Sequence, residues 1–224
     1  MKPMVIAIDG PSGAGKGTVA RAIAMRLGYR HVDTGAMYRA VAWQAVQCGV
    51  LPGDEPAMAA LAERAALDVD GDLIRIDGQD VTRAIRTPEI DRAAAAAARL
   101  PRVRAALVAR QRLAGENGGV VMEGRDVGTV VFPHADVKIY LDASPEERAR
   151  RRADDPAHAA GRQAALADVA SELQARDHSD RTRATSPLTK AEDAFLVDTT
   201  GLTIEQVVEQ VLRIVEEKMT TLGR

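Results

Sequence analysis

Short apolar runs, rich in β-branched residues, recur along the chain between longer segments of helical periodicity. These runs predict strands, because turn residues flank them and they are too short for buried helices. They are Met4–Asp9, Tyr29–Asp33, Val120–Glu123, Val137–Leu141 and Phe195–Asp198. Apolar strands that alternate with helices are typical of a parallel sheet covered on both faces. We therefore expect an α/β fold built on a five-stranded parallel sheet.

Helical periodicity fills the segments between the predicted strands. Helices are expected at Thr18–Leu27, Thr34–Gln47, Pro145–Arg152 and about Ala159–Asp177, with two more between residues 56 and 117. A final helix carries an apolar stripe formed by Ile204, Val207, Val208, Val211, Leu212 and Val215. Ser144, Thr189 and Thr203 each precede a Glu or Gln by three residues, which predicts a capped helix start at each position.

The segment Leu67–Val81 breaks this alternation of strand and helix. Its polar and apolar residues alternate with period two, and Gly71 and Gly78 stand at turns, which predicts a small antiparallel meander. Its aspartates lack the twelve-residue ligand order of a calcium loop. We therefore expect a solvated hairpin inserted into the α/β domain.

The first predicted strand runs directly into a glycine-rich loop. The loop consists of Gly10, Pro11, Ser12, Gly13, Ala14, Gly15, Lys16, Gly17 and Thr18. Glycines let backbone N–H groups point inward at a phosphate, the helix that follows adds the positive end of its dipole, and the lysine supplies a cation. A strand before the loop and a helix after it favour a nucleoside triphosphate site over a turn without a ligand. Gly17 stands between Lys16 and Thr18, a variant that resembles the loop of nucleoside monophosphate kinases.

Composition narrows the choice of partners. The 30 basic and 32 acidic residues give a net charge of −2, which argues against duplex nucleic acid or an anionic membrane as a partner. Cys48 is the single cysteine, so we expect no disulfide within the chain, and we interpret Cys48 as a small buried apolar residue. The sequence shows no signal peptide and no apolar stretch that approaches a membrane span. A cytoplasmic, monomeric protein with a single core is expected.

Arginines and carboxylates gather at the ends of several other elements. The segments are Asp33–Arg39, Pro101–Arg104, Glu123–Pro133 and Arg176–Ala184. In a doubly wound sheet ligands bind at the carboxyl ends of the strands. We therefore expect Thr34 and Arg39 to face the same crevice as Lys16.

These segments, in this order after the glycine-rich loop, resemble bacterial cytidylate kinases. The resemblance extends from about Val5 to Glu217 and includes D-T-G-A-M-Y-R, E-G-R-D-V-G-T-V-V-F-P and R-A-T-S-P-L. It implies a P-loop fold of adenylate-kinase type within a single domain over residues 1–224, an acceptor-binding insert at about 57–84 and an arginine-rich lid at about 148–162. It also implies ATP as phosphate donor, CMP and dCMP as acceptors, and Mg²⁺ as cofactor.

The resemblance assigns roles to matching residues. Arg39 and Arg125 would grip the acceptor phosphate; Thr34, Arg104, Asp126 and Arg183 would surround cytosine; Arg176 and Asp180 would hold the pentose. Cytosine has acceptors at O2 and N3 beside a donor at N4, so arginine with a hydroxyl or carboxylate can recognise it. Uracil has the opposite polarity at N3 and O4, and it would leave a buried arginine without its partner.

Phosphoryl transfer requires positioning and charge neutralisation more than covalent chemistry. Lys16 would follow the migrating charge, and Thr18 would lie on the Mg²⁺ side. The lid offers Arg148, Arg150, Arg151 and Arg152, and periodicity does not decide which two act; Arg148 and Arg151 are our candidates beside Lys16 and Arg125. Glu123 either orients metal-bound water or serves as a structural carboxylate.

Three other functional hypotheses are compatible with some of these features. Asp198–Gly201 fits the D-x-x-G of a regulatory GTPase, but it stands near the carboxyl end and the sequence contains no N-K-x-D segment. An inactive ATP-binding module would not need the acceptor arginines, and a uridylate or adenylate kinase would differ at the base-reading positions. One position departs from the family: Ala95 stands where cytidylate kinases often carry a serine that helps to hold the pentose.

Overall fold

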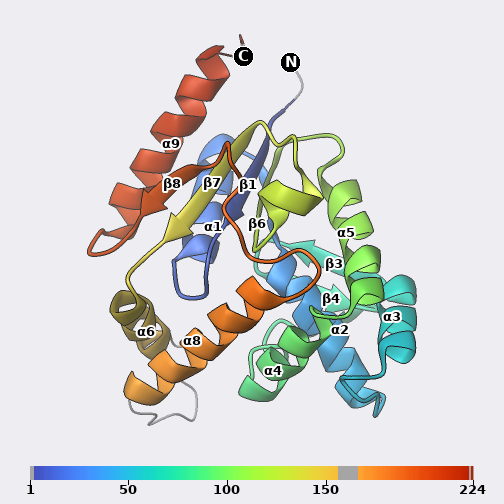
Figure 1. Ribbon diagram of the computed structural model, residues 1–224. Helices are drawn as coiled ribbons and strands as arrows, with labels where there is room; N and C mark the ends of the chain where they lie inside the picture. Colours follow the sequence, from blue (N-terminus) through green and yellow to red (C-terminus); the bar gives the residue numbers. More distant parts are fainter. Residues whose placement is uncertain (1–2, 156–165, 222, 224) are drawn as a thin grey trace. The chain divides into compact units, whose positions relative to one another are not determined.

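The computed structural model describes residues 3–155, 166–221 and 223 (Figure 1). The chain divides into two compact units. Unit 1 combines Met1–His31 with Gly115–Arg224, and unit 2 is Val32–Ala114. Each unit is treated by itself below.

A parallel sheet forms the centre of unit 1. Its strands, within the described part of the chain, are β1 (Val5–Asp9), β2 (Arg30–Asp33, the last two residues of which are counted in unit 2), β6 (Val120–Gly124), β7 (Val137–Asp142) and β8 (Phe195–Asp198), in the order β2-β6-β1-β7-β8. β1 lies at the centre and pairs in parallel with β6 and β7, so that Asp9 is aligned with Gly124 and with Tyr140. The predicted fold class, a five-stranded parallel sheet with a small antiparallel insert, is confirmed.

Helices complete unit 1. Among the described residues they are α1 (Lys16–Leu27), the π-helix η1 (Val127–Val131), α6 (Pro145–Asp154), α8 (Leu166–Thr182) and α9 (Ile204–Thr221). α1 and α9 pack together, and their apolar side chains share one core with β1 and β7 (Figure 1). α1 ends where predicted, because Gly28 takes the left-handed conformation (φ 65°) that closes a helix.

Unit 2 contains four helices and an antiparallel sheet among its described residues. The helices are α2 (Thr34–Gln47), α3 (Glu55–Arg64), α4 (Pro88–Ala97) and α5 (Pro101–Gly115), the last of which ends one residue beyond the unit. The strands are β3 (Leu67–Asp70), β4 (Leu73–Ile76) and β5 (Gln79–Asp80), in the order β3-β4-β5. The predicted meander is therefore confirmed, and α2 has the predicted bounds.

Several expectations about local structure are wrong. The segment between residues 56 and 117 holds three helices, α3, α4 and α5, where periodicity predicted two. Cys48 is exposed, because it follows the last turn of α2. Ile204 is 50% exposed although it fits the apolar stripe, because it is the first residue of α9; the other five members are buried. η1 follows the predicted strand at β6 without a periodic signal in the sequence.

The helix predicted at about Ala159–Asp177 lies partly outside the described residues. α8 begins the described chain again at Leu166 and continues to Thr182, five residues beyond the predicted end. Residues 156–165, which include the end of the predicted lid, lie outside the described residues. No helix in the described ranges is long and apolar enough to cross a membrane.

The three predicted capping signatures have different outcomes. Ser144 accepts a hydrogen bond from the N–H of Glu147 and caps α6. Thr203 and Gln206 form a reciprocal pair at the start of α9, with distances of 2.9 and 3.3 Å. Thr189 begins no helix, since the chain turns before β8. The signature alone therefore does not decide whether a helix follows.

Because only Thr203 caps a helix, replacing each threonine by alanine should lower the free energy of unfolding by different amounts. Thr203→Ala should lower the free energy of unfolding by about 1 kcal/mol, because an N–H at the start of α9 loses its acceptor. Thr189→Ala should change it by less than about 0.5 kcal/mol, the usual limit for a surface substitution. Denaturant unfolding of both variants measures the difference, and equal losses would contradict the assigned cap.

Candidate functional site

The glycine-rich loop joins β1 to α1 at the carboxyl end of the central strand. Gly10 has no room for a side chain, because a Cβ there would lie 2.0 Å from the backbone oxygen of Leu141. Gly13 has φ 80°, and a Cβ there would lie 2.9 Å from Arg148. The glycines are therefore required by the close approach of β7 and α6 as well as by the shape of the loop.

Lys16 is buried at the start of α1. Its side chain is turned back to the loop, where Nζ donates to the backbone oxygen of Pro11 at 2.7 Å, and 7% of the residue is exposed. Burial, and next the charge of Arg125, lower the pKa of Lys16 to about 7; Glu123 and Asp9 partly offset this. A nearby phosphate would favour the charged ammonium, so the site is ready for an anion.

Arg148 and Arg151 of α6 both reach the loop. Arg148 is buried, and it donates to the backbone oxygens of Ser12 and Ala143 at 3.1 Å each and to the carboxylate of Asp177. Arg151 lies beside Gly15, three residues further along the loop than Ser12. A Cβ built on Gly15 would be 3.7 Å from Arg151 Nη1. The structure therefore places the two arginines that we selected beside the loop.

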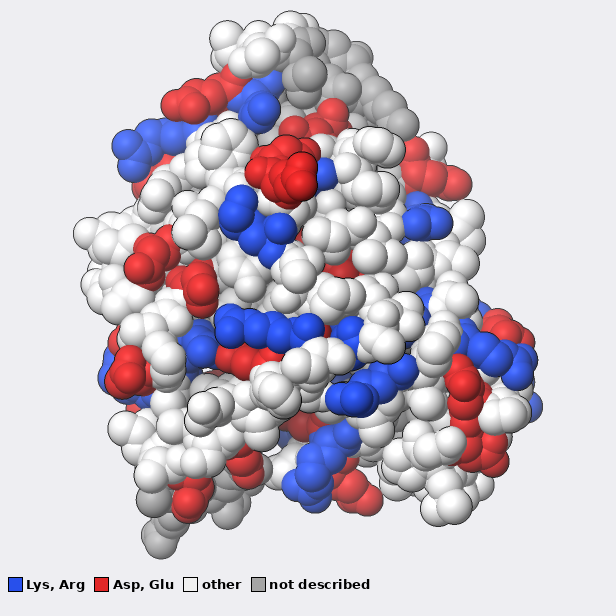
Figure 2. All heavy atoms as spheres, viewed as in Figure 1, with Lys and Arg blue, Asp and Glu red and all other residues white. Residues whose placement is uncertain are grey.

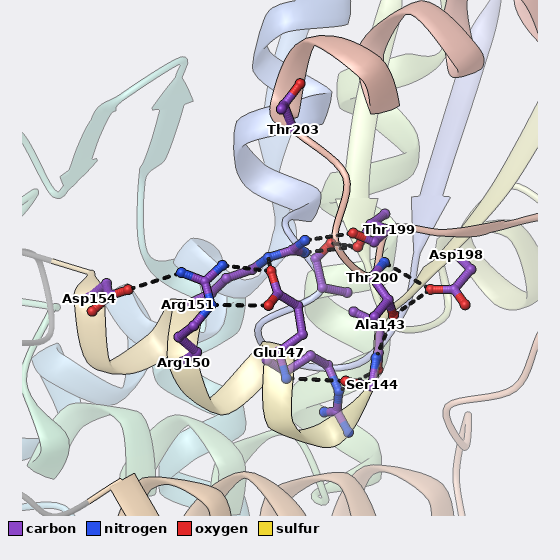
Figure 3. Close-up of polar contacts among 12 residues, drawn as sticks. Ala143, Ser144, Glu147, Arg150, Arg151, Asp154, Asp198, Thr199, Thr200 and Thr203 are labelled. Carbon is purple, nitrogen blue, oxygen red and sulfur yellow. Dashed lines mark hydrogen bonds and ion pairs between the residues drawn. The ribbon is translucent and has the colours of Figure 1, made fainter.

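The contacts of Arg151 are visible in Figure 3. Arg151 donates to Glu147 at 2.8 Å, and to the hydroxyl and the backbone oxygen of Thr199 at 2.8 and 2.6 Å. Arg150 points away toward solvent and pairs with Glu147 and Asp154, and its side chain is 60% exposed (Figure 3). The helix thus separates an arginine that faces the loop from one that faces water.

Glu123 is buried near the carboxyl end of β6, next to the loop. A Cβ built on Gly17 would lie 3.0 Å from Glu123 Oε1, and the same oxygen is 3.2 Å from His31 Nε2. The nitrogen on the other side of the ring, His31 Nδ1, has no hydrogen-bond partner among the residues described. His31 therefore orients Glu123, a contact that the sequence did not suggest.

Two ion pairs connect the segment after β6 with the end of α8 and the residue beyond it. Arg125 Nε donates to Asp180 at 2.9 Å, and Arg183 lies 3.3 Å from Asp126. Burial alone would raise the pKa of Asp180, but the charges of Arg125 and Arg176 outweigh burial and hold the pKa below its ordinary value. Burial would likewise lower the pKa of Arg125, and the carboxylate of Asp180 reverses that shift. Both groups of the pair therefore stay charged.

The predicted site residues of unit 2 gather at the start of α2 and on α5. Thr34 is buried at the first position of α2, and Arg39 donates to Asp33 at 2.9 Å. Arg104 of α5 is 2% exposed; it donates to the backbone oxygen of Ala98 at 3.2 Å and lies 5.6 Å from the ring centre of Tyr38. Each arginine is thus fixed by neighbours in its own unit.

The predicted magnesium ion can be tested against these side chains. Mg²⁺ takes oxygen ligands and keeps several waters, so it needs few protein groups where phosphates supply the rest. Thr18 is an exposed residue in the first turn of α1, and the carboxylate of Glu123 lies beside that turn. In the described ranges, no group of three or more His, Cys, Asp or Glu side chains is arranged so that it could hold a metal ion. The donor set therefore fits a phosphate-bound Mg²⁺ and not a site built from protein ligands alone.

Charges of both signs share the surface in Figure 2. Basic side chains lie interspersed with acidic ones on the face that is shown, without a continuous basic stripe. This agrees with the net charge of −2. Anion binding on this face depends on local groups and not on a broad positive field.

Sequence reasoning did not predict which carboxylates pair with the site arginines: Asp180 was assigned to the pentose, and Asp177 was not assigned at all. Asp177 and Asp180 stand three residues apart on α8, so they share one face of the helix, and they hold Arg148 and Arg125. Thr199 and His31 were missed as well: His31 lies in a predicted strand and Thr199 in the D-x-x-G segment, and neither pattern indicated these contacts. The spacing of the two aspartates was the one available signal.

A parallel sheet whose central strand ends in a glycine-rich loop around a buried lysine defines a P-loop nucleotide-binding protein. The family model described as cytidylate kinase matches residues 6–217, and the chain belongs to the cytidylate kinase family. It is therefore an enzyme of a kinase family.

Relatives support this assignment over nearly the whole chain. A cytidylate kinase of Solibacter usitatus is 50% identical, and the match covers 98% of this chain and 95% of that protein. A cytidylate kinase of Desulfitobacterium hafniense is 48% identical, with 98% and 96% covered. In fold, the chain is similar to the crystal structure of an uncharacterized protein from Eubacterium ventriosum at a TM-score of 0.52 and 8% identity, covering 95% of this chain and 98% of that one.

The lowered pKa of Lys16 predicts that phosphate binding takes up a proton. Above pH 7 the buried amine of the free protein is partly neutral, and an anion next to it restores the ammonium. The affinity for inorganic tripolyphosphate should therefore fall as pH rises through about 7. Calorimetry at pH 8 in two buffers of different ionisation enthalpy measures the proton uptake. Lys16→Met should take up fewer protons, and equal uptake by both proteins would contradict the assignment.

Proposed function

We propose that this chain transfers the γ-phosphoryl group of ATP to CMP and dCMP in the presence of Mg²⁺, giving ADP with CDP or dCDP. The observation that carries the proposal is the buried Lys16 inside the loop, in a chain that belongs to the cytidylate kinase family. The names of the relatives, cytidylate kinases over 98% of this chain, support CMP as the acceptor. A monomeric, cytoplasmic enzyme is part of the same proposal.

The donor phosphates would be held by the loop. Backbone N–H groups of Gly10–Thr18 and the start of α1 receive them, and Lys16 supplies a charge that acts most strongly as negative charge moves between the nucleotides. Thr18 would hold Mg²⁺, with Glu123 orienting its water. When bound, the ion neutralises charge on the β- and γ-oxygens.

The acceptor would be held by arginines that are already oriented. Arg39 and Arg125 are assigned to its phosphate, because a guanidinium binds phosphate oxygens in a two-pronged manner. Thr34, Arg104, Asp126 and Arg183 are assigned to cytosine, and Arg176 and Asp180 to the pentose. The buried state of Arg104 and Arg183 supports their role in base reading, because a buried arginine facing the wrong base lacks compensation by water.

Arg148 and Arg151 are assigned to the donor side of the transfer. Their contacts with Ser12 and Thr199 support this assignment, since they bring both side chains to the loop. Excluding water matters here, because water that reached the γ-phosphoryl would compete with CMP.

One assay separates the proposed reaction from its alternatives. ADP formation from ATP and Mg²⁺ should be fast with CMP and dCMP, slow with UMP, AMP or GMP, and close to background without an acceptor. Equal ADP formation with and without acceptor would identify an ATPase. A preference for UMP or AMP would identify a kinase of another nucleotide.

Lys16→Met should keep the fold and lower kcat by about two to three orders of magnitude, because the lost charge acts chiefly on the transition state. Circular dichroism checks the fold, and the coupled ADP assay measures turnover. A variant that keeps most of its activity would overturn the assigned role of the loop.

Arg104→Met and Arg183→Met should weaken CMP binding by about 10- to 100-fold and ATP binding far less, because each removes a charged hydrogen-bond donor. Arg110→Met on α5 is the matched control, since Arg110 contacts the exposed backbone oxygen of Glu63. Titration calorimetry with each nucleotide measures the effect. An equal loss for CMP and ATP would mean that these arginines hold the fold or the donor.

Ala95→Ser should increase the preference for CMP over dCMP. Ala95 is half-buried on α4, outside the fully buried positions of that helix, so a hydroxyl can be accommodated. A neutral hydrogen bond to the pentose contributes about 1 kcal/mol, which corresponds to roughly fivefold in the ratio of kcat/KM values. An unchanged ratio would show that position 95 does not face the sugar.

A further inference from the structure

Asp9, the last residue of β1, holds two successive backbone amides with one carboxylate. Oδ1 accepts from the N–H of Val127 at 2.8 Å, and Oδ2 accepts from the N–H of Gly128 at 2.7 Å. The residue is 5% exposed, so water does not share these bonds. Both amides belong to the first turn of η1, where helical N–H groups have no partners within the helix.

The same residue also fixes the other end of this short segment. The backbone of Asp9 is aligned with Gly124, the last residue of β6, in the parallel sheet. Arg125 and Asp126 therefore stand between Gly124, which is aligned with the backbone of Asp9, and η1, whose amides the carboxylate of Asp9 holds. These are the two residues assigned above to the acceptor phosphate and to cytosine.

Ionisation of the Asp9 carboxyl group does not stabilise the fold. Burial raises the pKa of Asp9 from 3.8 to about 6; the N–H groups of Gly128 and Val127 partly offset this, Asp126 adds to it and Lys16 opposes it. Because the folded pKa lies above the unfolded value, this group stabilises the fold below about pH 4. That contribution is lost as pH rises through about 6. The ionised carboxylate at neutral pH thus reduces stability, which favours a functional role.

Other charged groups around Asp9 are accounted for. The stem of Lys138 passes η1, 3.2 Å from a Cβ built on Gly128, but its Nζ donates to Pro133 and to Asp193. Lys16 Nζ donates a hydrogen bond to the backbone oxygen of Pro11, and Asp126 forms an ion pair with Arg183. The direct partners of the Asp9 carboxylate are therefore the two amides of η1.

We propose that Asp9 is a positioning residue for the acceptor: its ionised carboxylate fixes the turn that presents Arg125 and Asp126. This inference rests on the proposed function. When the carboxyl group gains a proton, one of its oxygens becomes a donor that faces an N–H group, so one of the two bonds is lost. The segment between Gly124 and η1 then remains aligned at Gly124 but is held at η1 by only one hydrogen bond.

Asp9→Asn reproduces this protonated form at every pH, because the amide has one acceptor and one donor in the same shape. The kcat/KM of the wild-type protein for CMP should rise with pH through about 6. At pH 8 the variant should lose about tenfold in kcat/KM for CMP, with a much smaller change in the KM for ATP. Because the phosphate of CMP also titrates near pH 6, the comparison is the ratio of wild-type to variant kcat/KM, which should rise with pH through about 6.

Asp136→Asn is the matched control. Asp136 Oδ2 accepts from the N–H of Val5 at 2.8 Å, so it holds a backbone amide at the opposite end of the same strand. This control should keep the wild-type pH profile and the wild-type ratio of CMP to ATP parameters. If Asp9→Asn keeps them too, or if both variants lose activity for both nucleotides alike, the positioning role is wrong.

A measurement on the unmodified protein keeps the proposal testable even if Asp9→Asn fails to fold. The amide proton shifts of Val127 and Gly128 should titrate together with a midpoint near 6. Shifts that stay constant between pH 5 and 8 would overturn the proposal. This titration needs no substrate, so it remains informative if the chain proves not to phosphorylate CMP, a result that would overturn the proposed function alone.

Discussion

Charge buried at the carboxyl end of the parallel sheet is the constraint on which the candidate site depends. Lys16, Arg148 and Arg183 are all buried there, and removing a charge from water costs several kcal/mol unless partners compensate. The partners are backbone oxygens of the loop and carboxylates of α8 and of the segment after β6. Each cation is therefore fixed in place, which is the condition for neutralising transferring charge without reorganisation.

Fixed arginines paired with carboxylates have a further consequence for selectivity. A phosphate that takes the place of a carboxylate partner must offer a similar arrangement of oxygens, because the guanidinium cannot turn freely. The Arg125–Asp180 pair has this character, since both groups are charged and largely enclosed. If Arg125 binds the acceptor phosphate as proposed, binding would exchange one anion for another and would avoid leaving a buried cation without a partner.

The sequence was most informative where backbone geometry dictates residue type. The strand, the loop and Gly28 follow from apolar patterning and from conformations that favour glycine, so β1 and α1 could be predicted nearly to the residue. Thr189 shows the limit of such local rules: it carries the same signature as Thr203, but no apolar stripe follows it to bury a helix. Cys48 was misplaced because composition describes a residue type and not the turn in which it stands.

The candidate site was predictable in its residue types but not in its pairings. Arginines at element ends indicated an anion site, whereas the partners of Arg148 and Arg151 depend on how α6 meets α8 and the loop after β8, which periodicity does not encode. The pairing itself shows why α8 matters. Asp177 holds an arginine assigned to the donor, and Asp180, one turn later, holds an arginine assigned to the acceptor. One helix face thus sets the positions of both arginines, so a shift of α8 would move them together.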